Sequence, residues 1–160
     1  MEAAGIERLF GRPLFLTRLT NWHWEPCDCD RFTLLIAADA STVTDAAIRA
    51  YAYAALTDGC EYVCAWGRDC ERVHDRFDDT YLGLETYSRQ PLMISTWHAD
   101  ETLPEALYFA LTLAFPDSEA TRSVGDRAPV VLAVAEQWIE EVRALVADQE
   151  ELNRLFAERD

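Results

Sequence analysis

Four short apolar runs, each separated from the next by a longer stretch with helical spacing, restrict the folds open to this chain. The runs are Phe32–Ala38, Cys60–Trp66, Pro91–Thr96 and Ala128–Val134. They are apolar along their whole length rather than alternating, which is typical of strands in a parallel sheet covered on both faces. Strand–helix repetition favours right-handed crossovers. We therefore predict an α/β fold: a single Rossmann-like or flavodoxin-like domain with a four- to five-stranded, mostly parallel sheet, helices on both faces, and strand order 2-1-3-4.

Helix signals lie between these runs. Ser41 or Thr42 is placed to cap a helix that ends at Asp58-Gly59. A short helix is expected from Asp69 to Phe77, resuming near residues 81–87. Thr102 precedes a proline and a glutamate at capping-box spacing, which predicts a helix start running to Phe115. One long helix is expected over residues 136–157.

The 160 residues are predicted to form one domain. Residues 1–30 read as an N-terminal extension or flap, in which Leu14–Leu16 adds an edge strand and NWHWEPCDCD forms a surface loop. Heptad spacing from Trp138 to Phe156 predicts a helix that packs on the sheet, or alternatively makes a homodimer contact.

The net charge of −15 bears directly on the partner. It argues against nucleic acid and anionic membranes, which require a basic surface, and suits a protein partner with a basic surface. All 14 cationic side chains are arginine, which excludes a Schiff-base lysine and a phosphate loop ending in Gly-Lys. With no apolar membrane span, no secretion signal and five cysteines read as free thiols, we expect a cytoplasmic protein.

Ligands of open α/β sheets bind beyond the carboxyl ends of the strands, where the strand order reverses. With the order 2-1-3-4, that point lies between the first and third strands. The residues delivered there are Asp39, Ser41, Trp66, Gly67, Asp69, Cys70, Thr96, Trp97, His98, Asp100 and Glu101.

Cys70 is the candidate nucleophile in this set. If Asp69 caps the following helix, the free N–H groups of the first turn favour the Cys70 thiolate. His98 is the candidate base, oriented by Asp39 or Asp100, and His74 is a nearer alternative base. The competing interpretation is a small buried cysteine packed under the loop.

Other ligands have weaker signals. Cys27 and Cys29 are spaced too tightly for the usual zinc motif, although a site that adds His23 or Cys70 stays open. No G-x-G-x-x-G is present and Asp39 occupies the first strand–helix turn, so no cofactor is expected. Four tryptophans are expected near the same rim, either as a ligand platform or as the top of the core: Trp22, Trp24, Trp66 and Trp97.

At GCEYVCAWGRDC (residues 59–70) and MISTWHADETLPEAL (residues 93–107), the chain resembles an uncharacterised bacterial family of small α/β proteins with AWGxDC and TWHxDE motifs. The resemblance implies that Trp66, Asp69, Cys70 and His98 form a unit, and it implies no activity.

Two functions follow as hypotheses. The first is an acidic protein-interaction or regulatory module without a cofactor, of which defence- or immunity-associated factors are one class. In this hypothesis Trp66, Trp97, Asp100 and Glu101 are the binding residues. The alternative is a thiol-dependent hydrolase or transferase that uses Cys70 with His98.

Overall fold

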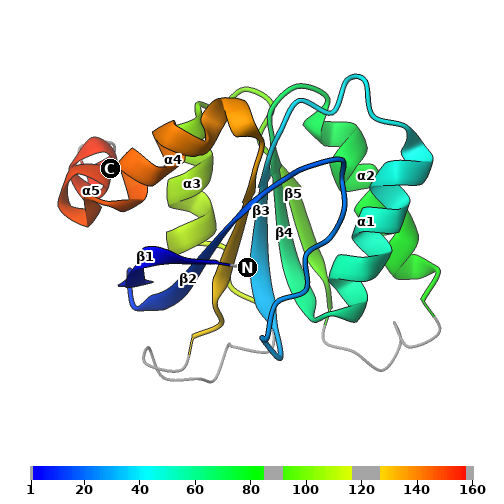
Figure 1. The fold of residues 1–160 in the computed structure, drawn as a ribbon, viewed down its shortest axis with the longest axis horizontal. Helices are drawn as coiled ribbons and strands as arrows, with labels where there is room; N and C mark the ends of the chain where they lie inside the picture. The colour runs from blue at the N-terminus through cyan, green and yellow to red at the C-terminus, as the bar shows by residue number, and fades with distance from the viewer. Residues whose placement is uncertain (1, 85–91, 117–126, 158–160) are drawn as a thin grey trace.

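The computed structural model describes residues 2–84, 92–116 and 127–157, and these form one mostly parallel sheet with helices packed on it (Figure 1). The strands are β1 (Glu2–Leu9), β2 (Arg12–Arg18), β3 (Phe32–Ala37), β4 (Cys60–Trp66), β5 (Ile94–Trp97) and β6 (Val130–Val134). The helices are α1 (Asp45–Thr57), α2 (Cys70–Leu82), α3 (Leu103–Thr112), η4 (Glu136–Trp138), α4 (Ile139–Val146) and α5 (Gln149–Ala157). Within these ranges every helix is too short or too polar to cross a bilayer.

The six strands lie in the order β1-β2-β6-β3-β4-β5. Only the β1–β2 pair is antiparallel. The expected order 2-1-3-4 is wrong: numbered as in the sequence prediction, the four apolar strands run 4-1-2-3. The chain steps outward from β3 through β4 to β5, and β6 then returns to the other side of β3. The order therefore reverses between β3 and β6.

The N-terminal hairpin supplies the two additional strands. The predicted strand at Leu14–Leu16 is part of β2, but it is not at the edge, because β1 pairs with it on one side and β6 on the other. The segment EAAGIERL that forms β1 has no apolar run or regular alternation, so sequence patterning gives no sign of it.

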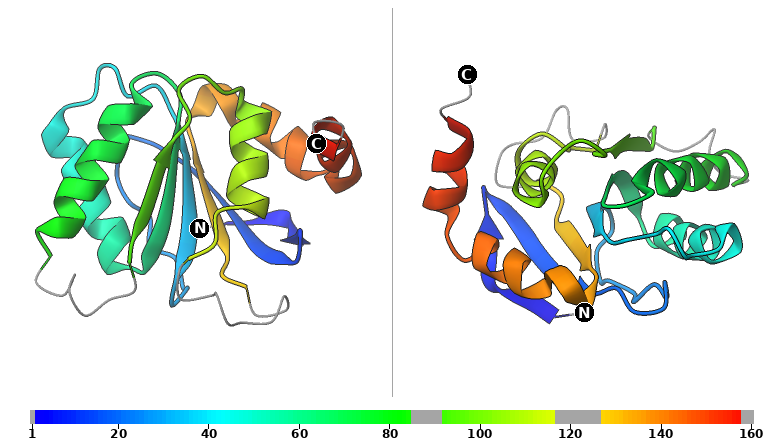
Figure 2. Two further views of the ribbon diagram at one scale, coloured as in Figure 1. Left: turned by 180° about the vertical axis from the view of Figure 1, so that it is seen from behind. Right: turned by 90° about the horizontal axis from the view of Figure 1, so that it is seen from above.

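The helices cover both faces of the sheet, and each face carries its own core (Figure 2). Alternate β3 residues separate onto the two sides: Leu34 and Ile36 join the core beneath α1 and α2, and Leu35 and Ala37 join the core beneath α3 and α4. Every residue of β3 and β6 is buried. Burial on both faces explains why these strands are apolar throughout.

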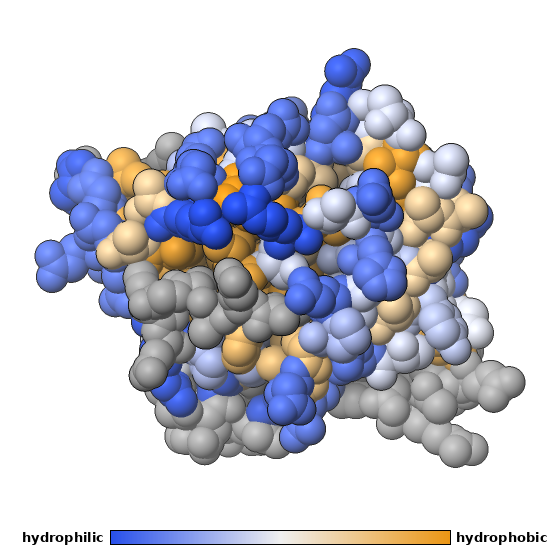
Figure 3. All heavy atoms as spheres, in the orientation of Figure 1, coloured by the Kyte–Doolittle hydropathy of each residue, from blue (hydrophilic) through white to orange (hydrophobic). Residues whose placement is uncertain are grey.

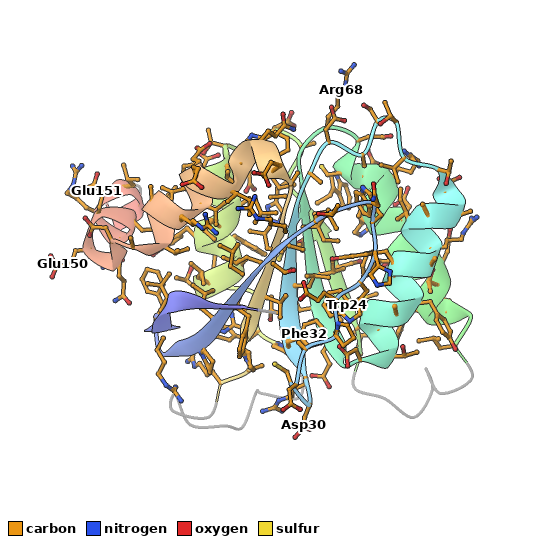
Figure 4. All side chains as sticks on the ribbon, viewed as in Figure 1. Trp24, Asp30, Phe32, Arg68, Glu150 and Glu151 are labelled. Carbon is orange, nitrogen blue, oxygen red and sulfur yellow. The ribbon has the colours of Figure 1, made fainter. Side chains whose placement is uncertain are left out.

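Residues 19–31 form a strap on the α1 face and not a flap over the strand ends. The Trp24 ring stacks on Phe32 with 5.4 Å between centroids and meets Tyr51 edge to face. The Asp58 carboxylate accepts hydrogen bonds from Trp24 Nε1 and from the backbone N–H of Cys27, both at 2.9 Å. Asp30 then leads into β3 at the lower edge in Figure 4. The strap therefore completes the core on the α1 face, where Trp24 packs on Phe32 and Tyr51.

Arg12 is a buried cation that ties four elements together. Its guanidinium donates to the carbonyl oxygens of Ala110 (2.8 Å) and Ala114 (2.9 Å) at the end of α3, to the carbonyl of Ala128, and to the Thr33 hydroxyl. A cation at a helix C-terminus is favoured by the helix dipole. Arg12 thereby fixes α3 against β2, β3 and the start of β6.

Several helix boundaries differ from the sequence predictions. The first helix is capped by Thr44, not by Ser41 or Thr42, and α2 continues without a break to Leu82. The expected resumption over residues 85–87 lies outside the described residues. The capping box between Thr102 and Glu105 is confirmed, although α3 ends at Thr112 and not at Phe115.

The expected long C-terminal helix is broken at residues 147–148. The Asp148 carboxylate accepts the backbone N–H of Glu151 and starts a new helix, α5. The break lets α5 turn onto α3, where Phe156 stacks on Tyr108 with centroids 4.7 Å apart. Val142 and Leu152 of the heptad series are buried within this chain. Much of the series thus packs internally, and a dimer contact through these helices stays a proposal.

Candidate functional site

The carboxyl ends of the parallel strands meet along one edge of the sheet, at the top in Figure 1, and we call the connections there the rim. The rim is defined by residues 38–44, 66–70, 97–102 and 135–138. Hydrophilic side chains stand along this upper edge, and Arg68 projects from it into solvent (Figures 3 and 4). The exposed carboxylates on it are Asp39, Asp69, Asp100, Glu101 and Glu136.

The turn after β4 is pressed against the turn after β3. Gly67 has φ +110°, and a Cβ atom there would lie 2.1 Å from the carbonyl oxygen of Ala38. Two backbone hydrogen bonds extend the strand pairing into the turns, from Ala38 N to Trp66 O (3.2 Å) and from Ala40 N to Arg68 O (2.9 Å). Only glycine fits this conformation and this approach. The glycine of the AWGxDC stretch is therefore explained by backbone packing at the rim.

Asp69 connects the same two turns. It adopts a left-handed conformation with φ 65° and makes no side-chain cap for α2, contrary to the prediction. Its carboxylate accepts instead from Arg72 Nε at 2.8 Å. Arg72 also donates to Asp45 on α1 and to the carbonyl of Ala40. The charge on Asp69 thus helps hold α2 against the β3–α1 connection.

Cys70 lies in the first turn of α2 but points into the core. Only 2% of its surface is exposed, and it belongs to the same buried cluster as Val73 and Phe77. Burial raises the pKa of the Cys70 thiol, and the polar backbone around it offsets the rise only in part. Loss of hydration therefore outweighs the helix N-terminus that was expected to favour the thiolate. The structure gives Cys70 the environment of a packing residue.

The His98 imidazole has both nitrogens engaged by side chains of its own loop. Nε2 lies 2.9 Å from Thr96 Oγ1, and Nδ1 lies 2.8 Å from Glu101 Oε2. The ring packs on Phe109 of α3 with centroids 4.8 Å apart and is 3% exposed. Glu101, rather than Asp39 or Asp100, therefore orients the imidazole. Neither ring nitrogen is left for the Cys70 thiol.

His74, the alternative base, belongs to a different cluster. Its Nδ1 lies 3.0 Å from Asp75 and its Nε2 lies 3.5 Å from Asp78. Its ring contacts Trp97 at a centroid distance of 4.5 Å. Ser95 Oγ donates to the other oxygen of Asp78. His74 thus joins α2 to the edge strand β5, through partners other than Cys70.

The four tryptophans expected on one rim are dispersed over three places. Trp22 and Trp24 both contact Tyr51 on the α1 face. Trp66 donates from Nε1 to the carbonyl of Glu101 at 2.8 Å and meets Trp138 edge to face at 5.0 Å. Trp138, expected as the first member of the heptad series of a final helix, lies instead in the η4 turn after β6, and the pairing of β3 with β6 brings it to the rim.

Trp97 is the exposed member of the predicted binding set. It ends β5 with 46% of its surface exposed, one contact being the His74 ring. Asp100 and Glu101 follow in the loop after β5, and both are exposed. An indole with a large exposed area beside carboxylates is a suitable anchor for a partner carrying apolar and cationic groups.

Hydrogen bonds and ion pairs keep several rim carboxylates ionised. Hydrogen bonding from Ser41 lowers the pKa of Asp39. Arg18, at the end of β2, forms an ion pair with Glu136 and lowers the pKa of that carboxyl. The Arg18–Glu136 pair has no local signal in the sequence, since the pairing of β2 with β6 brings together two residues 118 positions apart. Asp39 and Glu136 are therefore ionised at neutral pH, and Arg18 balances the charge of Glu136.

Metal and phosphate ligation find little support in this geometry. Across the described ranges, no three His, Cys, Asp or Glu side chains are grouped so as to hold a metal ion. Cys27 is buried in the strap and Cys29 is half-buried beside it. After β3, the Asp39 carboxylate accepts the backbone N–H of Ser41 at 2.9 Å, which uses a donor that a phosphate would need.

Comparison with known proteins gives one result. Residues 17–149 match the model of a family described as Domain of unknown function (DUF7684). This range contains both stretches on which the family resemblance was based. No curated protein and no solved structure matches the chain.

Proposed function

This chain belongs to the DUF7684 family, and we propose that it is a protein-interaction module that docks a basic partner protein on its acidic rim. The carrying observation is the placement of exposed carboxylates on all four connections of the rim: Asp39, Asp69, Asp100, Glu101 and Glu136. The proposal favours one class of protein: a regulatory or immunity-type factor that covers a basic surface of its partner.

The fold supports the choice of the rim as the binding edge. The order β5-β4-β3-β6, with helices on both faces, supports a single Rossmann-like domain. In such sheets the crevice beyond the reversal of strand order is the usual binding site. Here that reversal lies between β3 and β6, where Asp39 and Glu136 follow the strands.

Charge and shape act together in this proposal. A net charge of −15 speeds the encounter with a basic surface and repels polyanions. Affinity requires desolvated anchors as well as charge, and aromatic side chains are the usual ones. Trp97, with Asp100 and Glu101 after it, provides such an anchor at the β5 end of the rim.

The alternative, a thiol-dependent hydrolase or transferase using Cys70 with His98, has less support. Burial raises the pKa of the Cys70 thiol, and the His98 nitrogens are bonded to Thr96 and Glu101. An activated thiol requires a lowered pKa or an adjacent free base. We therefore do not advance this function.

Charge reversal on and away from the rim tests the proposal. The rim variant is Asp39→Arg/Asp100→Arg, and the matched control is Asp28→Arg/Glu150→Arg; all four residues are exposed. Each tagged protein is expressed at its native level, and co-purifying protein is quantified at two salt concentrations. We expect the wild type and the control to retain one stoichiometric basic protein, with less at high salt, and the rim variant to lose it.

Equal retention by the rim variant and the control would contradict docking on the rim. Circular dichroism of both variants shows whether each is folded, so that a loss of binding is assigned to the surface and not to unfolding.

A further inference from the structure

Thr96, His98 and Glu101 are arranged as a nucleophile, a base and an orienting carboxylate. The Thr96 hydroxyl oxygen lies 2.9 Å from His98 Nε2, and His98 Nδ1 lies 2.8 Å from Glu101 Oε2. These contacts place one imidazole nitrogen on a hydroxyl and the other on a carboxylate. This is the geometry by which a histidine activates a hydroxyl nucleophile.

We propose that Thr96 is the nucleophile of an acyl-transfer site, with His98 as its general base and Glu101 holding the imidazole, and that the substrates are small carboxylic esters or thioesters. This activity goes beyond partner docking and does not depend on it.

The backbone around these three side chains is fixed by strand pairing, by hydrogen bonds and by the start of α3. Thr96 lies on β5, which pairs with β4. The His98 N–H continues that pairing by donating to the carbonyl of Ala65 at 2.9 Å. Glu101 is fixed by the Trp66 indole, which donates to its carbonyl, and the capping box of α3 begins at the next residue. The constellation is thus preorganised rather than dependent on a mobile side chain.

Tyr62 supplies the group that an acyl-transfer site needs for its oxyanion. Tyr62 lies on β4, two residues before Cys64, which pairs with Thr96 in the sheet, so the side chains of Tyr62 and Thr96 lie on the same side of the sheet. Burial raises the pKa of Tyr62 to about 12, so the phenol keeps its proton at neutral pH. A neutral phenol beside the attacking oxygen is able to donate to the negative charge that develops on the carbonyl oxygen.

The edge of the sheet provides the approach for a substrate. β5 is the last strand in the sheet order, and among the described residues no strand lies beyond it. Thr96 keeps part of its surface exposed, and Trp97 beside it is largely exposed. The rings of Tyr62 and His98 both pack on Phe109, which gives the inner side an apolar wall. Small acyl groups suit a site with one apolar wall and one open side.

The chemical step balances without a metal or a redox partner. Thr96 Oγ1 attacks the acyl carbon and forms a C–O bond as its proton passes to His98 Nε2. The tetrahedral oxyanion accepts a hydrogen bond from Tyr62, then collapses and expels an alcohol or thiol, which takes the proton from His98. Water repeats the sequence, releasing the carboxylic acid and restoring the Thr96 hydroxyl.

The test uses the full chain with two probes: a fluorophosphonate, which phosphonylates an activated hydroxyl with loss of fluoride, and p-nitrophenyl acetate, whose hydrolysis is followed by absorbance. Peptide mass spectrometry locates the adduct. The variants are Thr96→Val, Thr96→Ser and His98→Gln. The matched control is Ser95→Ala, which removes the neighbouring hydroxyl, bonded to Asp78 rather than to a histidine.

We expect the adduct on Thr96 and none on Ser95. Thr96→Val should abolish labelling, Thr96→Ser should retain it, and Ser95→Ala should leave both readouts unchanged. His98→Gln should lower ester hydrolysis about 100-fold or more, the usual contribution of a positioned base. Wild-type protein that stays unlabelled at Thr96, or hydrolysis that persists in folded Thr96→Val, would overturn the proposal. Labelling of Thr96 in the wild-type protein is decisive by itself, so the proposal can still be refuted if a variant fails to fold.

Discussion

At the scale of single residues, the rim is built by positions that tolerate little change. Gly67 is the clearest case, because both its φ of +110° and the 2.1 Å approach to the Ala38 carbonyl exclude a side chain. Asp69 adopts a left-handed conformation at its own energetic cost and is held there by Arg72. The local strain lies where the turns after β3 and β4 touch.

Replacing Gly67 by alanine should therefore destabilise the protein by about 1–3 kcal/mol from backbone strain alone, and by more if the turns must separate. Gly83→Ala is the matched control, because Gly83 has an ordinary φ of −82° and a Cβ there would lie 3.5 Å from its nearest neighbour. Urea denaturation measures both. If the two variants have equal midpoints, the tight approach of the turns is not the reason for the glycine.

The reactivity of Cys70 provides a second test at this scale. Burial raises its pKa, so at any given pH a smaller fraction is thiolate than in the unfolded chain. We expect iodoacetamide to alkylate native Cys70 more slowly than the denatured protein throughout the neutral range, by peptide mass spectrometry. Rapid native alkylation well below pH about 8.5, the usual thiol pKa, would contradict this and revive the thiol hypothesis.

At the scale of elements, the loop after β5 and the start of α3 act as one unit. Thr102 accepts the backbone N–H of Glu105, and Glu105 returns a carboxylate to the N–H of Thr102. In the preceding residues, His98 Nδ1 and Glu101 Oε2 lie 2.8 Å apart. The helix cap therefore also fixes the geometry of the exposed acidic loop.

Thr102→Ala should cost about 1 kcal/mol of folding free energy, as other N-cap losses do. It should also speed amide exchange over residues 98–105, because the cap and the loop share their anchors. Thr42→Ala, at an exposed threonine in the β3–α1 connection, should change neither value. If amide exchange at residues 98–105 is unchanged in Thr102→Ala, the helix cap does not stabilise the loop, and the prediction is wrong.

The elements best predicted from the sequence are those with one dominant local cause. β3, β4 and β6 were recognised because continuous apolar runs are required by burial on both faces. The start of α3 was recognised because proline and a capping box agree. The break at residues 147–148 was missed, since it depends on where α5 finds a partner on α3.

At the scale of the whole molecule, the strand order and the partners of the side chains could not be predicted, because both depend on contacts between residues far apart in the sequence. The strand order depends on where the crossover after α3 delivers β6, and apolar runs carry no information on that destination. The predicted site residues do lie along one rim, because parallel strands end at a common edge. The partner of each side chain was not predictable: His98 binds Thr96 and Glu101, while Cys70 turns into the core.

The measurement that tests rim docking most directly is cross-linking mass spectrometry of the native complex with a carboxylate-to-amine reagent, which joins Asp and Glu of this chain to lysines of a basic partner. We expect cross-links concentrated at Asp100, Glu101 and their rim neighbours, and none at Glu150, which lies at the α5 end of the molecule (Figure 4). Cross-links centred on Glu150 and Glu151, with the rim unmodified by partner lysines, would contradict it.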